Sequence, residues 1–409
     1  MTLAPDSGRL SYLGEVAGLL WPQPARFGPG AAAARDTGPD QALAEFFLLP
    51  GVRRPRLLVP AERRAGAAAL RRYGEPRSWT AAAGSRALSL ALASGAAGLL
   101  LRNRKLVVRA PEAADTVETY LGTVLGTRVL VSMHLGPARA NRKPVLQLVT
   151  PLGATVGFAK IGINPFTREL VRAERDALNR LNERGLTTLA VPKVLHYGTW
   201  RGLDLLVLDA LPVWLRRRPL PADRLATAMR EVAWSCGVRR GPLAGSSYWE
   251  RLGARLASAE ASADRDALLT ILSRLEAAGG GACLGYGHWH GDWTSWNMAS
   301  TRRGLLVWDW ERFTGDVPLG FDALHYWLQH AAAPGNREPA IAAADCVGAA
   351  PRLLAPFAVP AGPARLTALL YLAELGTRYL LDKQARAGAR LGAPGRWLIP
   401  ALARALAGQ

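Results

Sequence analysis

Residues 290–297 read His-Gly-Asp-Trp-Thr-Ser-Trp-Asn, and a later apolar run ends in Val-Trp-Asp-Trp-Glu at residues 307–311. Asp292 and Asn297 share one loop, and Asp309 directly follows a strand-like segment. Carboxylate and amide oxygens bind Mg²⁺, and a carboxylate beside an acceptor hydroxyl serves phosphoryl transfer from ATP. The pattern predicts one site in which Asp292 orients or accepts the acceptor's proton, while Asn297 and Asp309 hold Mg²⁺.

An upstream strand carries the cation that a nucleotide site of this kind needs. Lys160 lies in Val-Gly-Phe-Ala-Lys-Ile, residues 156–161, and is one of only five lysines in the chain. Glu174 follows on a helical pattern, and an acidic residue on a packed helix can hold such a lysine toward the α- and β-phosphates. Glu169, earlier on the same helix, is the rival partner. These positions predict a nucleotide-binding half upstream of the catalytic loop.

Both halves together resemble the aminoglycoside phosphotransferase and choline kinase family, whose members are relatives of the protein kinases. The family's catalytic loop reads H-G-D-x-x-x-x-N and its metal segment ends in D-W/F-E, as residues 290–297 and 307–311 do. The resemblance covers roughly residues 125–385. It departs from the family at the phosphate loop, because a turn without G-x-G-x-x-G, residues 136–144, stands between the first two strands of this half.

The resemblance implies a role for each matched residue. Asp292 corresponds to the catalytic base, and His290 and Asp322 to structural positions. By the same resemblance Asn297 and Asp309 hold Mg²⁺, and Lys160 and Glu174 belong to the ATP site. The segment Leu-Leu-Val-Leu-Asp-Ala-Leu-Pro, residues 205–212, is similar to the family's hinge, so that the backbone at Leu208 and Ala210 would bind the adenine.

The order of the segments predicts an α+β fold with three regions. Residues 1–115 read as an accessory N-terminal α/β region whose role the sequence does not reveal. Residues 116–212 contain closely spaced β-rich segments, which are typical of an antiparallel sheet, and end at the hinge. Residues 213–409 read as mainly helical and carry the catalytic loop. By the resemblance, the last two regions form the small and large lobes of a bilobal, protein-kinase-like fold.

Composition narrows the class of protein. The formal net charge is +19, but the arginines are spread among alanines and glycines, so we expect no nucleic-acid partner. The three cysteines are far apart, and no secretory pattern opens the chain, which indicates a cytoplasmic protein without a disulfide framework.

The apolar run 87–101 is too short to span a membrane and predicts a buried helix. The oligomeric state stays open.

Three alternatives compete with these interpretations. His288, His290 and Asp292 also spell H-x-H-x-D, a zinc hydrolase spacing, although Trp293 stands where a further histidine is needed and His325 and His330 look like packing or surface residues. A non-catalytic kinase-like protein that binds nucleotide is the second alternative. The tryptophans at 289, 293, 296, 308 and 310 could form a cage for a cationic ligand, but core packing is commoner. The acceptor is expected to be a sugar, an amino alcohol or a related small hydroxylated metabolite.

Overall fold

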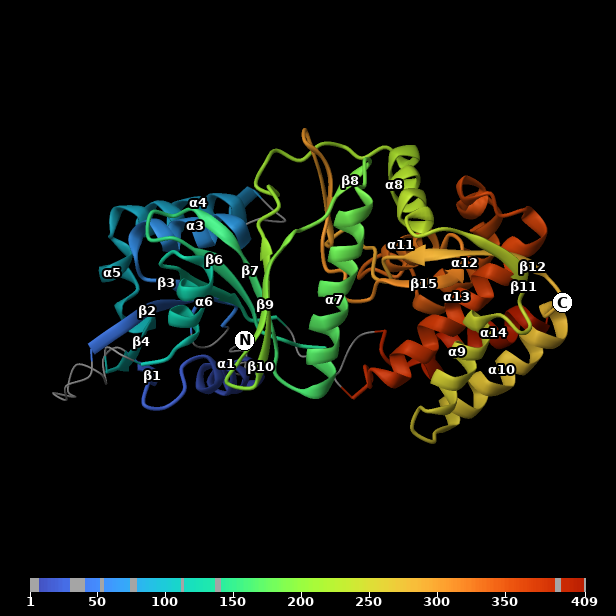
Figure 1. Cartoon of the computed structure of the whole chain (residues 1–409), viewed down its shortest axis with the longest axis horizontal. Coiled ribbons are helices and arrows are strands. Elements are labelled where there is room, and N and C mark those ends of the chain that lie inside the picture. The colour runs from blue at the N-terminus through green and yellow to red at the C-terminus, as the bar shows by residue number, and fades with distance from the viewer. Residues whose placement is uncertain are drawn as a thin grey trace. The chain divides into compact units, whose positions relative to one another are not determined.

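The computed structural model describes residues 7–29, 41–51, 55–73, 79–111, 114–136, 141–386 and 391–407. These residues form a mixed α+β structure, which confirms the predicted fold class (Figure 1). The chain divides into two compact units, here called the sheet unit and the helical unit. The sheet unit contains residues 1–138, 142–171 and 194–214, and the helical unit contains residues 139–141, 172–193 and 215–409.

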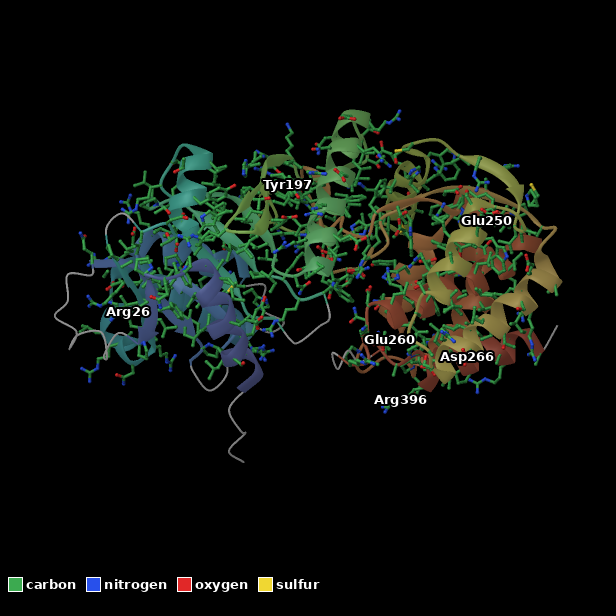
Figure 2. All side chains as sticks on the ribbon, turned by 60° about the horizontal axis from the view of Figure 1, so that its bottom comes forward. Arg26, Tyr197, Glu250, Glu260, Asp266 and Arg396 are labelled. Carbon is green, nitrogen blue, oxygen red and sulfur yellow. The ribbon has the colours of Figure 1, made fainter. Side chains whose placement is uncertain are left out.

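Within the described residues, the sheet unit is built on one antiparallel sheet of nine strands in the order β1-β4-β2-β3-β5-β6-β7-β10-β9. Arg26 and Tyr197, labelled in Figure 2, lie on its two edge strands, β1 and β9. The strands are β1 (Arg26–Pro29), β2 (Gln41–Leu49), β3 (Leu57–Pro60), β4 (Lys105–Ala110), β5 (Leu130–His134), β6 (Val145–Val149), β7 (Thr155–Gly162), β9 (Val194–Trp200) and β10 (Leu203–Asp209).

Helices cover both faces of this sheet. Side chains alternate between the faces along a strand, so Phe46 and Leu48 of β2 pack into one core and Phe47 and Leu49 into the other. The first core includes α1 (Ser7–Leu20) and α6 (Val117–Leu125), and the second includes α3 (Arg63–Tyr73), α4 (Trp79–Ser94) and the short α5 (Ala97–Leu100). Figure 1 shows α3 and α4 together along one side of the strands.

The boundary predicted at residue 115 does not divide the structure. Strand β3 of the N-terminal region pairs directly with β5, with Leu57 opposite His134 and Leu58 opposite Met133. Strands of the first 115 residues therefore belong to the same sheet as strands of the following region.

The apolar run 87–101 is not a buried helix, and this prediction is wrong. Gly95, with a φ of 88°, separates α4 from α5. Leu90, Leu99 and Leu100 are exposed by 70%, 82% and 72%, whereas Leu92 and Ala97 are buried. The run is therefore only partly buried, and several of its leucine side chains are exposed.

The helical unit consists mainly of helices and also contains two small sheets. Most of α7 (Pro165–Arg184) belongs to this unit, and the other helices are α8 (Ala222–Trp234), α9 (Ser247–Ala257), α10 (Ala263–Gly279), α11 (Phe321–Ala331), α12 (Pro339–Leu354), α13 (Ala361–Leu381) and α14 (Leu398–Ala407). One sheet pairs β11 (Arg239–Pro242), β12 (Cys283–Trp289) and β15 (Thr314–Pro318), and the other pairs β13 (Met298–Thr301), β14 (Gly304–Val307) and β8 (Leu189–Ala190).

Helix α13 is the centre of this core, since thirteen of its residues are buried. Its C-terminal end is tied to the α9–α10 connection by Glu260, labelled in Figure 2, which pairs with Lys383 and Arg386. By length and composition alone, residues 339–357 are the one stretch of the described chain that could cross a membrane. Six buried residues of α12 pack in the core, as in the core helix of a globular unit.

Candidate active site

Two strands carry the motif residues to one place in the helical unit. Strand β12 ends at Trp289, directly before the catalytic loop, and β14 ends at Val307, two residues before Asp309. The hairpin of β13 and β14 pairs Met298 with Val307, and the N–H of Trp308 donates to the carbonyl of Asn297 at 3.0 Å. The loop with Asn297 and the segment with Asp309 are therefore neighbours, as the motif predicted.

His290 joins the two segments through both of its ring nitrogens. Nδ1 accepts the N–H of Asp292 at 3.1 Å, so Nε2 carries the proton and donates to the carbonyl of Trp308 at 3.1 Å. Burial lowers the pKa of His290 to about 4, which keeps the ring in the neutral form that this pair of bonds requires. A single buried imidazole thus fixes the catalytic loop against the metal segment.

Asp322 holds the beginning of the loop from the first turn of α11. Its two carboxyl oxygens accept the N–H of His290 at 2.7 Å and that of Gly291 at 3.2 Å. Gly291 is required here, because its φ is 83° and a Cβ would lie 2.5 Å from the carbonyl oxygen of Arg312. Arg378 donates to the carbonyl of Gly291 from α13. The N–H groups of His290 and Gly291 and the carbonyl group of Gly291 therefore all have side-chain partners.

Asp292 has two side-chain partners that orient its carboxylate. The Nδ2 group of Asn297 donates to Oδ2 at 3.1 Å, and Nε2 of His325 lies 3.1 Å from Oδ1. Burial opposes ionisation, but the hydrogen bond from His325 and the positive charge of Arg378 hold the pKa of Asp292 below its ordinary value. The carboxylate is therefore ionised at neutral pH, as a proton acceptor must be.

His325 was not found by sequence reasoning, which treated it as a packing or surface residue. It is fully buried on α11, and its Nδ1 lies 3.0 Å from the hydroxyl of Tyr371. Burial lowers its pKa, so the ring is neutral, with Nε2 donating to Asp292 and Nδ1 accepting from Tyr371. The only sequence signal was its spacing of three residues after Asp322, which places both on one helix face.

Three carboxyl groups gather at the metal segment. Ligand oxygens of Glu174, Asp309 and Glu311 all lie within 4.8 Å of one another. Trp310 donates its backbone N–H to Oε1 of Glu174 at 3.2 Å, and Asn141 donates to Glu311 at 3.2 Å. Hard oxygen donors at this spacing fit Mg²⁺ or Ca²⁺, because the cation offsets the repulsion between the carboxylates.

This cluster adds neighbours that the motif did not predict. Glu174, expected as the partner of Lys160, lies in the helical unit beside Asp309. Asp309 adopts a φ of 73°, which is uncommon for a residue other than glycine and turns the chain immediately after Trp308. Asn297 donates through Nδ2 to Asp292, which leaves its amide oxygen as the group that can bind a cation.

The remaining predicted residues lie in the sheet unit, on two paired strands or directly after one of them. Lys160 is 8% exposed on β7, opposite Val145 of β6 and Leu206 of β10. Leu208 is buried on β10, and Ala210 follows the end of that strand. Lys160 and the hinge backbone are thus held by neighbouring strands. Residues 137–140 of the turn without a glycine motif lie outside the described residues.

The tryptophan cluster is mainly core, which agrees with the packing interpretation. Trp289, Trp293 and Trp310 are 3% exposed or less, and Trp293 donates to the sulfur of Met298 at 3.4 Å. Trp296 differs, because 53% of it is exposed between the catalytic positions. A closed aromatic cage is therefore not formed by the three buried rings.

The zinc alternative does not fit the site. Both ring nitrogens of His290 are bonded to backbone groups, so neither is available to a metal. Among the described residues, the one cluster of possible metal ligands is the carboxyl group set of Glu174, Asp309 and Glu311, which contains neither His288 nor His290.

The sequence matches no family model and no curated protein. The structure is similar to that of a thermostable mutant of the aminoglycoside phosphotransferase APH(4)-Ia, with 15% identity, coverage of 71% of this chain and 99% of that chain, and a TM-score of 0.47. It is also similar to the choline kinase LicA from Streptococcus pneumoniae, with 14% sequence identity, coverage of 71% of this chain and 99% of that chain, and a TM-score of 0.43. A choline/ethanolamine kinase family protein from Mesorhizobium loti has 16% sequence identity, with coverage of 66% of this chain and 91% of that chain and a TM-score of 0.36. These are proteins of the kind that the sequence motifs resemble.

Proposed function

We propose that this protein transfers the γ-phosphoryl group of ATP to a hydroxyl group of a small molecule, such as a sugar, an amino alcohol or a related metabolite. The proposal rests on the hydrogen bonds that hold the loop of Asp292 and Asn297 against the segment of Asp309. His290 connects the two through its ring nitrogens, and the N–H of Trp308 donates to the carbonyl of Asn297. These hydrogen bonds keep a candidate base and candidate metal ligands close together.

Asp292 acts on the acceptor hydroxyl. As the oxygen of the acceptor attacks the γ-phosphorus, its bond to phosphorus forms, the bond from phosphorus to the leaving oxygen of ADP breaks, and the hydroxyl proton passes to the carboxylate. His325 and Asn297 each hold one carboxyl oxygen, so the group is oriented before the substrate binds. Positioning of this kind supplies most of the rate in phosphoryl transfer.

Asn297 and Asp309 would hold Mg²⁺, and Glu174 and Glu311 lie close enough to Asp309 to share that role. The bound metal supplies charge neutralisation for the transferred group. In the sheet unit, Lys160 serves the α- and β-phosphates, and the backbone of Leu208 and Ala210 serves the adenine. A strand lysine that is largely buried loses little side-chain entropy when it binds an anion.

The test is turnover by the purified protein with Mg-ATP and a panel of sugars and amino alcohols, followed by ADP release. Asp292→Asn keeps the shape of the side chain and should lower kcat at least 10³-fold while the affinity for Mg-ATP stays within twofold. Lys160→Ala should instead weaken Mg-ATP binding at least tenfold.

Two outcomes would contradict the proposal. Turnover in Asp292→Asn close to that of the native protein would remove Asp292 as the base. Stabilisation by Mg-ATP with no turnover of any acceptor would favour the alternative of a non-catalytic nucleotide-binding protein. Absence of both would rule out the ATP site itself.

A further inference from the structure

A pocket lies in the sheet unit, among residues that the proposed reaction does not use. Its volume is about 640 Å³, it is open to solvent on one side, and it is lined by residues of α6, of the connection from α6 to β5, and of strands β2 and β4. Its apolar wall includes Trp21, Leu43 and Val108, and its polar wall includes Thr116, Glu118 and Thr119. A space of this size is sufficient for a small organic molecule.

Apart from Glu118, the side chains of α6 that line the pocket are small. Thr119, Gly122, Thr123 and Gly126 line it at helical spacing, whereas Val117 and Leu121 are buried in the core. A Cβ added at Gly122 would meet a single atom, the carbonyl oxygen of Thr127, at 3.5 Å. The backbone does not require glycine at this position, so its small size serves to leave the space open.

Glu118 is the acidic residue of this wall, and its carboxyl group is only half bonded. Oε2 accepts the indole N–H of Trp21 at 2.8 Å. Oε1 is buried, and no described residue forms a hydrogen bond with it. A buried carboxyl oxygen without a donor is unfavourable by about 1–3 kcal/mol, which a bound ligand with an N–H group could recover.

The other charges around the pocket do not neutralise this carboxyl group. Arg128, the one basic residue of the described lining, pairs with Glu62 at 2.9 Å and is mostly exposed. The aromatic wall is rigid, because Trp21 stacks on Phe27 at 5.1 Å with an angle of 9° between the rings and also contacts Phe46. The lining therefore combines one acidic group with a fixed apolar surface.

We propose that this pocket binds a small organic cation, a primary amine with an apolar body, whose ammonium group pairs with Glu118 and whose body packs on Trp21, Leu43 and Val108. Every lining residue belongs to the sheet unit and none is part of the candidate active site. The proposal is therefore independent of the phosphotransfer proposed above. The first 115 residues contribute Trp21, Leu43, Ala44 and Val108 to the wall of this pocket.

The test is binding of benzylamine to the full-length protein by isothermal titration and ligand-observed NMR, with benzyl alcohol and benzoate as probes of the same shape. We expect saturable binding of benzylamine and at least tenfold weaker binding of the alcohol and the acid. Two variants probe the site separately: Glu118→Gln removes the charge and keeps the shape, and Gly122→Leu fills the space. Each should weaken benzylamine binding at least tenfold.

Glu15→Gln is the matched control, because it makes the same chemical change on an exposed residue of α1 and should leave binding unchanged. Gly122→Leu should fold, since leucine is favoured over glycine inside a helix by about 1 kcal/mol. Thermal unfolding and Mg-ATP affinity report on the integrity of all three variants. The proposal is overturned if benzylamine and a set of other primary amines show no saturable binding, or if benzylamine binds both pocket variants as tightly as the native protein.

Discussion

Asp322 and Glu118 occupy the same local position in the two units but differ in their hydrogen bonds. Each is the second residue of its helix, α11 and α6 respectively, and burial raises the pKa of each to about 7. Both oxygens of Asp322 accept backbone N–H groups of the catalytic loop, whereas Oε2 of Glu118 accepts the indole N–H of Trp21 and Oε1 of Glu118 has no hydrogen-bond partner among the described residues. Burial and pKa alone therefore do not distinguish a structural carboxyl group from one that is left for a ligand.

The difference follows from what each helix faces. The first turn of α11 meets a bend of the backbone, where Gly291 turns with a positive φ and its N–H points at Asp322. The first turn of α6 meets a pocket instead, so no backbone N–H reaches Oε1 of Glu118. An acidic residue in a first turn is favoured by the helix dipole in both cases, by about 0.3–1 kcal/mol.

Replacing Asp322 by Ala should have the largest effect of the changes considered. Two buried N–H groups would lose their acceptor, so we expect a loss of about 2–4 kcal/mol in the free energy of unfolding and at least 100-fold in kcat. Glu118→Ala, the matched change, should cost less than half as much stability and leave kcat unchanged. Urea unfolding and ADP release measure both quantities. Equal losses in the two variants would remove the distinction drawn between these carboxyl groups.

His325→Phe should lower kcat by 10- to 100-fold, which is the next largest effect. The ring keeps its volume in the core but no longer donates to Asp292, so the base is free to rotate. The KM for ATP should not change. Tyr371→Phe removes only the hydrogen bond from the Tyr371 hydroxyl to Nδ1 of His325 and should lower kcat less than fivefold. A native kcat in His325→Phe would show that Asn297 alone orients Asp292.

The catalytic segment could be predicted from sequence because its chemistry depends on short spacings. Asp292 and Asn297 share one loop, and the hairpin that follows brings Asp309 back to it, so local strand pairing was sufficient to place all three together. Strands β5, β6, β7 and β10 were likewise visible as short β-rich runs between turns. The roles of these loop and strand residues in binding ATP and Mg²⁺ stay predictions.

Residues that depend on distant contacts could not be predicted in this way. His325 contacts Asp292 only because α11 packs beside the loop, and an isolated histidine in an apolar helix carries no sign of that. The pairing of β3 with β5 joins segments more than seventy residues apart, so the first 115 residues looked like a separate region. The pocket beside Glu118 depends on the small residues of α6, which resemble an ordinary helix in sequence.

The raised pKa of Glu118 predicts a pH-dependent stability. The unfolded chain releases this proton near pH 4.5 and the folded protein near pH 7, so the unfolded state holds fewer protons between these values and stability falls as pH rises through them. The loss from this group should be about 2–3 kcal/mol. Glu118→Gln should remove it, so that the variant gains stability over the native protein between pH 5 and pH 8, as measured by urea unfolding. Asp322 titrates in the same way in the native protein and in Glu118→Gln, so its contribution cancels when the two free energies of unfolding are subtracted. Parallel stability curves would contradict the assignment.

Trp21→Phe sharpens the comparison with the smallest effect. It removes the indole N–H that donates to Glu118, and a hydrogen bond to a charged acceptor is stronger than one to a neutral acceptor by about 1 kcal/mol. The packing lost with the larger ring is the same at every pH, so the difference between the losses at pH 8 and pH 5 isolates the bond. We expect the loss in the free energy of unfolding to be about 1 kcal/mol larger at pH 8. Trp293→Phe is the control, because its N–H donates to the sulfur of Met298, which does not titrate, and its loss should be independent of pH. A loss in Trp21→Phe that is equally independent of pH would mean that the indole does not stabilise an ionised Glu118.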